Sequence, residues 1–558
     1  MATPNPRALD PWRNERVFPV LTPPQIAAIA AHGRRRKTTR GEVLLEVGDK
    51  TLHFFLVASG ELEALRPAAG SETTIVVLAP GQFSGETNLI TGRRSLSRIR
   101  VREGGEVIEL ERDQLLTLVQ TNAELGEILM RAFLLRRTAL IAGGFGDVVV
   151  IGSAHCASTL RVKEFLTRNG HPFQYIDLDH DADAQELLDR FHIESRDIPV
   201  LICGTDTVLR NPTNAQVAEC LGFNDSVDPK SVRDLVIVGA GPAGLAAAVY
   251  GASEGLDVLV VEANAPGGQA GSSSRIENYL GFPTGISGLD LTSRAYAQAQ
   301  KFGAQIMIAT GATQLACKRQ PYAVDVGGAS RVQSRALIIA TGAEYRRPSL
   351  DNLSRFEGAG VYYGATPMEA QLCGGEEVIV VGGGNSAGQA AVFLAQTATR
   401  VQVFVRGGGL SDTMSRYLVR RIEDNPAILL RTHTEIVGLE GEAHLARVRW
   451  RNNQTGQVET ADVAHVFMMT GAVPNTAWLS GCVALDDKGF IKTGTDLSID
   501  DLSAFGWPLT RPPFLLETSQ PGVFAVGDVR ARNVKRVASA VGEGSIAVSF
   551  VHQVLQKS

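Results

Sequence analysis

Cysteines, closely spaced cysteine pairs and long apolar runs are scarce in this chain, and each shortage excludes a class of protein. The 558 residues include six cysteines, and no two of them are spaced as Cys-x-x-Cys. We therefore expect no disulfide framework, and a reducing cytoplasm is the compartment that fits such a sequence. No segment approaches the ~20 apolar residues of a membrane-spanning helix. Residues 1–20 carry charges and prolines and no apolar core, so they do not resemble a secretory signal.

A strong charge of either sign is also absent. The formal net charge is −5, so no global positive field attracts nucleic acid or anionic lipid. We expect no nucleic-acid partner, no membrane partner and no metal site. The composition, 44% hydrophobic and 20% charged, is that of a globular protein. At roughly 100–200 residues per domain, the length predicts three to five domains.

The order of apolar runs and turns predicts domains of different architecture. Residues 38–110 alternate short apolar runs with glycine turns, which predicts a β-barrel or roll, and a helical stretch follows over 112–142. The glycine-rich residues 143–146 mark a boundary, and the polar residues 224–232 read as a linker. Between them lies an α/β sandwich pattern. Its strands are expected at 148–151, 173–176 and 198–202, and its helices at 157–168, 182–192 and 214–221.

A glycine-rich turn, residues 239–244, lies between an apolar strand and a helix, and a second strand after the helix ends in Glu262. Gly239 allows the tight turn, Gly241 lets the backbone approach a pyrophosphate, and Gly244 lets the helix and strand pack closely. The pyrophosphate then meets the free N–H groups of the helix N-terminus. Glu262 can accept hydrogen bonds from both hydroxyls of an adenosine ribose. These parts together predict a dinucleotide site.

A second turn, residues 382–387, has the same setting, with a strand over 378–381 before it and a helix over 386–396 after it. Its second strand ends at Arg406 and not at an acid. A cation there suits a 2′-phosphate, which favours NADP over NAD. The candidates for further phosphate contacts are Arg416, Arg420 and Arg421.

Two later segments favour FAD as the first ligand. Residues 340–342, Ala-Thr-Gly, follow a strand, and Asp528 stands between a strand and a helix near 535–550. Asp528 can bind the ribityl chain, while the helix N-terminus faces the pyrimidine end of the flavin.

At these residues the chain resembles the low-molecular-weight thioredoxin reductases. The likeness spans 233–558 and includes Gly-Gly-Gln at 267–269, Ile-Glu-Asn-Tyr at 276–279 and Gly-Phe-Pro at 281–283. It implies FAD, NADPH, a homodimer and two Rossmann-like, three-layer ββα domains. The FAD domain is expected at 233–352 and 480–558, with the NAD(P)H domain inserted at 353–479. The implied cofactor-binding residues are Gly239, Gly241, Pro242, Ala243, Gly244, Glu262, Gly268, Gln269, Asn278, Thr341, Gly342, Gly382, Gly384, Asn385, Ser386, Ala387, Arg406, Gly527, Asp528, Lys535 and Arg536.

One departure from that family concerns the redox chemistry. The family's Cys-x-x-Cys lies just before the strand of the NADPH domain, and the corresponding stretch here is Ala365-Thr366-Pro367-Met368. Cys373 is nearby but alone. A dithiol relay needs one thiolate to attack and a second to resolve the mixed disulfide. The usual route to thioredoxin is therefore missing. Residues 500–518 are expected to form an extra loop near the flavin.

Residues 15–142 resemble a cyclic-nucleotide-binding domain. The likeness rests on residues 81–86, Gly-Gln-Phe-Ser-Gly-Glu, and 93–95, Arg-Arg-Ser. It implies that Glu86 binds the ribose 2′-OH and Arg94 neutralises the cyclic phosphate, with Gly85, Ser95 and the N–H groups of 85–87 helping. The gap of eight residues between Glu86 and Arg94 is shorter than usual in the family. A roll kept only for packing or dimerisation is the alternative.

Residues 147–223 resemble a thioredoxin- or glutaredoxin-like domain. Ser153-Ala154-His155-Cys156 stands where a redox motif belongs, and residues 198–200, Ile-Pro-Val, resemble the family's cis-proline turn. Cys156 would lie at a helix N-terminus, which lowers the pKa of a thiol and supports a monothiol role. A small core cysteine is the alternative. Cys203 and Cys220 are expected in the core.

The sequence predicts a multidomain chain: a β-roll, an α/β thioredoxin-like domain and two Rossmann-like domains that bind FAD and NADPH. We predict an oxidoreductase that takes hydride from NADPH onto FAD. The electron acceptor is open among a small disulfide, a quinone, oxygen and a redox protein, and a cyclic nucleotide would tune the activity. The alternatives are a ferredoxin- or flavodoxin-NADP reductase, electron transfer through Cys156, and a non-enzymatic sensor of flavin and nucleotide.

Overall fold

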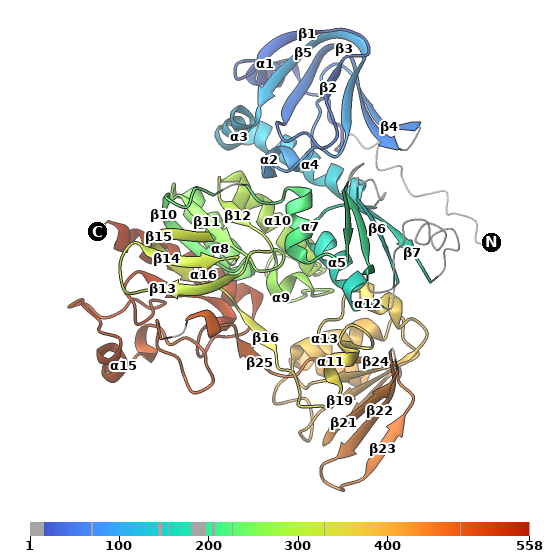
Figure 1. The fold of residues 1–558 in the computed structure, drawn as a ribbon, viewed down its shortest axis with the longest axis vertical. Helices are drawn as coiled ribbons and strands as arrows, with labels where there is room; N and C mark the ends of the chain where they lie inside the picture. Colours follow the sequence, from blue (N-terminus) through green and yellow to red (C-terminus); the bar gives the residue numbers. More distant parts are fainter. Residues whose placement is uncertain are drawn as a thin grey trace.

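The computed structural model describes residues 16–68, 71–142, 148–153, 156–179, 197–203, 207–225, 227–327, 330–442, 444–479 and 481–556. The predicted boundary at 143–146, the predicted helix at 182–192, and Ala154 and His155 of the predicted redox motif lie outside these residues. Figure 1 shows the N-terminal roll at one end of the molecule and the inserted Rossmann unit at the other. The middle unit and the first Rossmann unit lie between them.

The roll, residues 16–142, is an antiparallel sheet wrapped around a core of fully buried phenylalanines, Phe54, Phe55, Phe83 and Phe133. The strand order is β1-β5-β3-β4, and β2 pairs with β5. The predicted helical stretch is two helices, because Asn122 leaves the helical conformation and its side chain accepts a hydrogen bond from the Leu125 amide. The elements are α1 (Pro23–Ala30), β1 (Arg34–Thr38), β2 (Val43–Leu45), β3 (His53–Ala68), β4 (Ser71–Leu78), α2 (Asn88–Thr91), β5 (Arg98–Glu111), α3 (Arg112–Thr121) and α4 (Ala123–Ala142).

The middle unit, residues 148–223, contains a four-stranded sheet in the order β7-β6-β8-β9. β6 and β7 are parallel, whereas β8 and β9 run antiparallel. The Ile198–Pro199 peptide bond is cis, as predicted. The sequence did not predict β9, because its four residues are mostly exposed and show no apolar alternation. The elements are β6 (Val148–Gly152), α5 (Ala157–Arg168), β7 (Phe173–Asp177), β8 (Val200–Cys203), β9 (Thr207–Arg210) and α7 (Asn214–Leu221).

The first Rossmann unit is built on a sheet in the order β12-β11-β10-β15-β14-β13, with β26 beside β15. β10, β11, β12, β15 and β26 are parallel, and β14 and β13 extend the same sheet as antiparallel strands. Apolar residues of α8 and α16 join those of β10 in one core, so these helices cover one face. The elements are β10 (Val232–Val238), α8 (Pro242–Ser253), β11 (Val258–Val261), α9 (Gly268–Gly271), α10 (Gly288–Lys301), β12 (Gln305–Met307), β13 (Ala312–Ala316), β14 (Tyr322–Val326), β15 (Ser330–Ile339), α15 (Ile499–Ala504), β26 (Val523–Ala525) and α16 (Val537–Leu555).

The inserted Rossmann unit begins and ends at a ribbon of two antiparallel strands, β16 and β25. Its parallel sheet has the order β17-β24-β18-β19-β20, and a separate antiparallel sheet has the order β21-β22-β23. The elements are β16 (Ala343–Tyr345), α11 (Leu353–Phe356), β17 (Val361–Tyr362), α12 (Pro367–Leu372), β18 (Glu377–Val381), α13 (Asn385–Leu394), β19 (Arg400–Phe404), α14 (Arg416–Glu423), β20 (Ile428–Arg431), β21 (Thr434–Gly441), β22 (Leu445–Asn452), β23 (Val458–Ala461), β24 (His465–Met468) and β25 (Ala472–Pro474).

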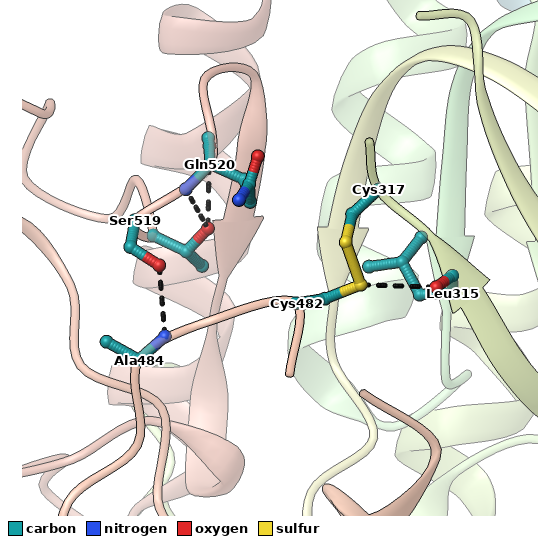
Figure 2. Close-up of a disulfide and its surroundings, with 7 residues drawn as sticks. Leu315, Cys317, Cys482, Ala484, Ser519 and Gln520 are labelled. Carbon is teal, nitrogen blue, oxygen red and sulfur yellow. Dashed lines mark hydrogen bonds between the residues drawn. A yellow bond between two sulfur atoms is a disulfide. The ribbon is translucent and has the colours of Figure 1, made fainter. Parts of the chain in front are cut away.

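A disulfide joins Cys317 to Cys482, a pairing that the expectation of no disulfide framework did not include (Figure 2). The two residues are 165 positions apart in the sequence, but the fold brings their Cα atoms to 5.8 Å. Sequence spacing cannot reveal such a pair, because the inserted unit lies between its members. Of the other four cysteines, Cys203 and Cys373 are buried, and Cys156 and Cys220 are half-buried. Within the described ranges, no helix has both the length and the apolar character needed to cross a bilayer.

Candidate cofactor and ligand sites

The first glycine turn joins β10 to α8 with the close approaches that the sequence predicted. Gly239 has a φ of +106°, and a Cβ built on it would lie 2.3 Å from the Ala340 carbonyl oxygen. A Cβ on Gly244 would lie 1.8 Å from the Gly239 carbonyl oxygen, so the helix and the turn pack without space for a side chain. Gly241 is the N-cap of α8, and a Cβ there would meet only the Gly268 Cα, at 3.9 Å. The helix N-terminus therefore opens onto free space.

That space is a cavity of about 510 Å³, and most of the predicted cofactor residues line it. Gly244 does not, because it is buried in the packing of α8. The segment 500–518, expected near the flavin, contributes no described residue to the lining. The predicted residues that do line the cavity are Gly239, Gly241, Pro242, Ala243, Glu262, Gly268, Gln269, Asn278, Thr341, Gly342, Asn385, Ser386, Gly527, Asp528, Lys535 and Arg536.

A buried acid, Glu262, and a half-buried acid, Asp528, face this cavity. Glu262 is 8% exposed and accepts hydrogen bonds from the amides of Ala240, at 2.7 Å, and Asn264, at 2.8 Å. Burial raises the pKa of Glu262, although these two bonds act against the shift. Burial also raises the pKa of Asp528, with the Lys535 ammonium group acting in the opposite direction. Both carboxyl groups are thus desolvated, which suits groups that accept hydrogen bonds from ligand hydroxyls.

The second glycine turn joins β18 to α13 in the inserted unit. Gly382 has a φ of +146°, and a Cβ on it would lie 2.4 Å from the Met469 carbonyl oxygen and 3.2 Å from the Ala387 Cβ. Gly384 is the N-cap of α13. Asn385 and Ser386, the first residues of the helix, line the same cavity as the first turn, whereas Gly382, Gly384 and Ala387 do not. The two nucleotide turns therefore face one space.

The predicted arginines of the inserted unit have different surroundings. Arg406 follows β19 and is exposed, and it does not line the cavity. Parallel strands end at one edge of a sheet, so Arg406 and the second turn lie at the same edge. Arg421, a candidate for phosphate contact, instead donates hydrogen bonds to the Glu277 carboxylate at 2.8 and 3.0 Å. This ion pair crosses between the two Rossmann units.

Sequence reasoning missed several residues of the cavity. Asn475 follows β25, and its Nδ2 donates to the Thr341 carbonyl oxygen at 3.0 Å. Trp478 lies beside it and donates to the Asn475 carbonyl oxygen. Arg168 comes from α5 of the middle unit, and its Nη2 donates to the Gly268 carbonyl oxygen at 2.9 Å and to that of Ala265 at 3.1 Å. No motif marks Arg168, because it reaches the cavity from another domain.

The roll has its own cavity, of about 70 Å³, and only part of the predicted nucleotide set lines it. Gly85, Glu86 and Ser95 do, but Arg94 does not. The Arg94 guanidinium lies against the middle unit, since a Cβ on Gly222 would be 3.0 Å from Arg94 Nε. The predicted phosphate-binding role of Arg94 is therefore not supported by its position.

Cys156 is half-buried and is the N-cap of α5, so its position at a helix N-terminus is as predicted. The helix that follows packs on the inserted unit. A Cβ on Gly358 would lie 2.6 Å from the Ala157 Cβ, and Leu160 shares an apolar core with Ala365 and Cys373. α5 therefore covers the stretch where the resemblance places a dithiol.

The residues of the first cavity fit FAD. They provide a helix N-terminus with room for a pyrophosphate, an acid after the second strand, and a buried nitrogen, Arg168 Nε, that has no hydrogen-bond partner in the described part of the chain. The second turn offers the same kind of helix N-terminus for a second dinucleotide. The geometry is that of a two-nucleotide oxidoreductase.

Comparison with known proteins agrees with this geometry. Residues 233–544 match the family described as pyridine nucleotide-disulphide oxidoreductase, and residues 35–122 match the cyclic nucleotide-binding domain. A thioredoxin reductase of Rickettsia felis is 31% identical over 59% of this chain and all of its own length. One from Mycolicibacterium smegmatis is 33% identical over 57% of this chain and 95% of its own.

Solved structures give the same result. The thioredoxin reductase of Lactococcus lactis in its FR conformation superposes with a TM-score of 0.52 at 26% identity, over 58% of this chain and 100% of its own. That of T. acidophilum superposes with a TM-score of 0.51 at 27% identity, over 57% of this chain and 98% of its own. These matches do not favour the ferredoxin- or flavodoxin-NADP reductase alternative. The chain belongs to the pyridine nucleotide-disulphide oxidoreductases, as a thioredoxin reductase-like flavoprotein of a family that uses FAD and NADPH, and it carries a cyclic nucleotide-binding domain.

Proposed function

We propose that this enzyme takes hydride from NADPH onto FAD and passes the electrons to a disulfide. The observation that carries the proposal is that Asn385 and Ser386, at the N-terminus of α13, line the same cavity as the first glycine turn. A nucleotide held by each turn would have its reactive end in this shared space. Bound FAD would accept a hydride and release two electrons, while the residues of the chain hold both nucleotides in register.

The residues of the first cavity have distinct roles in holding FAD. The N-terminus of α8, opened by Gly241, faces the pyrophosphate, and its free N–H groups favour negative charge. Glu262 accepts hydrogen bonds from the adenosine ribose. Asp528, which precedes α16 in the sequence, lines the cavity and accepts hydrogen bonds from the ribityl hydroxyls. Gln269, fixed by its bond to the Ala343 carbonyl oxygen, shapes the wall between them.

Preference for NADPH over NADH rests on Arg406. Its guanidinium is exposed at the end of β19 and has no partner among the described residues, so it is free to bind a 2′-phosphate. Arg406→Gln should weaken NADPH binding ~10-fold or more, as expected for the loss of a charge-assisted hydrogen bond, and leave NADH binding unchanged. The matched control is Arg400→Gln, an exposed arginine at the opposite end of the same strand.

The experiment is anaerobic stopped-flow mixing of the FAD-loaded chain with NADPH or NADH, followed at the flavin absorbance band. Fast bleaching by NADPH and slow bleaching by NADH, with the difference lost in Arg406→Gln, supports the proposal. Bound flavin that neither nucleotide reduces contradicts it and favours the sensor alternative. The homodimer expected from the resemblance stays a prediction, which sedimentation velocity of the full chain tests.

A second candidate concerns the route by which electrons leave. Among the described residues, Cys373 is the cysteine nearest in sequence to the second turn, and it is fully buried, which raises its pKa to about 11. The Cys156-bearing helix α5 covers residues 365–373 instead, so an external thioredoxin would meet the middle unit there. We propose that the Cys156 thiolate attacks a small disulfide, releases one thiol and forms a mixed disulfide. Two electrons from the reduced flavin, with two protons, then cleave this bond, release the second thiol and restore the Cys156 thiol.

The test of this route is NADPH oxidation with glutathione disulfide or another small disulfide as acceptor. Cys156→Ser should abolish turnover and leave flavin reduction by NADPH unchanged. Cys220→Ser is the matched control, since it removes a free, half-buried cysteine of the same unit. Unchanged turnover in Cys156→Ser would show that electrons pass from the flavin to the acceptor directly.

A further inference from the structure

The cavity of the roll contains a buried cation that the predicted nucleotide set did not include. Arg136 stands on α4, is 4% exposed and lines the cavity beside Gly85 and Glu86. Its Nε donates to the Val17 carbonyl oxygen at 2.9 Å, and its Nη1 donates to that of Gly85 at 2.7 Å. Its Nη2 is buried and has no hydrogen-bond partner within the described residues. Two N–H donors of this guanidinium are thus left over at the cavity.

Arg136 also has no ion-pair partner at contact distance among the described residues, although the nearby Glu86 carboxylate attracts its charge. The rings of Phe18 and Phe83 lie 4.4 and 4.6 Å from its guanidinium carbon, and no described carboxylate lies within ion-pair distance. Glu86, the acid of the cavity, pairs instead with Arg137 at 3.3 Å. Burial lowers the pKa of Arg136 to about 9, so the group still carries its proton at neutral pH. An unpaired buried charge is costly, and an anion in the cavity would offset that cost.

The backbone next to Arg136 offers further donors. Gly85 has a φ of +100°, a left-handed conformation that turns successive amides toward one side. The N–H groups of Gly85, Glu86 and Thr87 make no hydrogen bond within the described part of the chain. A row of free amides beside an arginine is a concave anion site of the kind that backbone turns form.

Arg94, to which the family resemblance assigned the phosphate, lies in a different place. Its guanidinium packs on Gly222 of the middle unit, outside the lining of the cavity. The rest of the lining is mostly aliphatic. It includes Leu45, Leu52, Ile75, Leu78, Leu96 and Leu140.

We propose that the roll binds a small organic anion whose charged group is held by Arg136 and the amides of residues 85–87, and whose apolar body lies on the aliphatic wall. Two kinds of molecule share this chemistry: a carboxylate with a short hydrocarbon chain, and a cyclic nucleotide with its phosphate moved from Arg94 to Arg136. The volume favours the carboxylate, since the cavity has about 70 Å³, against about 150 Å³ for a protein cavity that admits benzene. The inference does not rest on the flavin chemistry, because it concerns a separate cavity.

The experiment is isothermal titration of the full chain with butyrate, hexanoate, cyclic AMP and cyclic GMP, with 1-hexanol as the uncharged probe. Arg136→Gln removes the charge and should weaken binding of the anion ~10- to 100-fold. Arg94→Gln is the matched control and should change the affinity less than about threefold, since Arg94 does not reach the cavity. Arg136→Lys should retain part of the affinity, because it keeps the charge and loses the planar donors.

Arg136 also holds Val17 and Gly85, so each variant is first checked by its melting curve. If Arg136→Gln does not fold, Ala64→Leu decides, because it fills the cavity and leaves Arg136 in place. It should abolish binding. Anion binding that depends on Arg136 supports the proposal, and the probe that binds identifies the source. Binding that depends on Arg94 and not on Arg136, hexanol that binds as tightly as hexanoate, or no saturable binding by any probe overturns it.

Discussion

Arg93 Nη2 donates a hydrogen bond to the Tyr296 hydroxyl at 3.1 Å and so ties the roll to α10 of the first Rossmann unit. The same guanidinium donates to the Asn169 carbonyl oxygen at 2.7 Å and lies 4.2 Å from the ring centre of Phe223, both in the middle unit. Arg93 is 4% exposed. One side chain of the roll therefore contacts both neighbouring units.

We predict that Tyr296→Phe weakens this junction. The variant removes the acceptor of a buried, charge-assisted hydrogen bond and should lower the free energy of unfolding by about 1–3 kcal/mol. Differential scanning calorimetry measures the effect as an earlier transition of the roll or of the first Rossmann unit. Tyr250→Phe is the control, since Tyr250 is 42% exposed on α8. Equal melting of Tyr296→Phe and the unchanged chain would mean that the bond contributes nothing to the junction.

Arg168 should make FAD binding depend on the middle unit. Its Nη2 donates to the Gly268 carbonyl oxygen, and its Nε is buried and has no hydrogen-bond partner among the residues that the structure describes. Arg168→Ala should raise the Kd of FAD ~10-fold, as expected for the loss of a charged donor. Equilibrium titration of the FAD-free chain by flavin fluorescence measures it.

Arg161→Ala is the control for Arg168, because Arg161 stands on the same helix but binds Pro212 and Asn214 within the middle unit. An unchanged Kd in Arg168→Ala would place its guanidinium outside the FAD contact.

Asp528 should give the FAD-free protein a pH-dependent stability. Burial raises the pKa of this carboxyl in the folded state, so the folded chain holds its proton to a higher pH than the unfolded chain. The contribution of Asp528 is thus most favourable below its ordinary pKa and is lost as pH rises through the raised value. Asp528→Asn removes this loss and should melt roughly 1–3 °C higher than the parent at pH 7.5, with a smaller gain at pH 5.

The matched control for Asp528 is Asp500→Asn, at an exposed position of α15. If the gain in melting temperature from Asp528→Asn does not grow with pH, a raised pKa of Asp528 is not its cause. The same variant should bind FAD more weakly, because an amide replaces the carboxylate that accepts from the ribityl hydroxyls.

The sequence predicted those parts of the site that depend on local backbone geometry. Gly239 and Gly382 are required where a Cβ would strike a carbonyl oxygen, and such positions leave a motif in the sequence. Glu262 was predictable for the same reason, since it stands at a fixed place after a strand. Short apolar strands also gave the order of the units.

Contacts between units were not predictable, because no local pattern records them. Arg168 and Arg94 each lie against another domain, so the first was missed and the second lies outside the cavity that Glu86 lines. Arg136 was missed because it lies on a helix far along the chain from the predicted nucleotide residues. The Cys317–Cys482 disulfide was hidden by the inserted unit.

The Arg421–Glu277 pair should hold the inserted unit with its nucleotide turn facing the cavity. The pair crosses between the Rossmann units and is partly exposed, with side-chain exposures of 49% and 23%. Such pairs contribute up to about 1 kcal/mol, so its loss should slow flavin reduction by NADPH at most about fivefold, through a smaller population of this arrangement.

The variant for this test is Arg421→Ala, measured by stopped flow at low and high salt, and Arg420→Ala is the control on the same helix. Added salt should slow the parent toward the rate of Arg421→Ala, because salt screens an exposed pair. A salt effect of the same size in Arg421→Ala would show that the salt dependence of the rate does not come from the Arg421–Glu277 pair.

The Cys317–Cys482 disulfide should stabilise the FAD cavity from outside it (Figure 2). Cys317 follows β13, and the first residue of β13, Ala312, lines the cavity. Cys482 lies four residues after Trp478, which lines the same cavity. Cys482→Ser should lower the free energy of unfolding by about 2–4 kcal/mol and weaken FAD binding, because the two segments are no longer tied together. Dithiothreitol should have the same effect on the parent and on Cys220→Ser, but none on Cys482→Ser. Equal melting and equal FAD affinity with and without the reductant would show that packing alone holds these two segments.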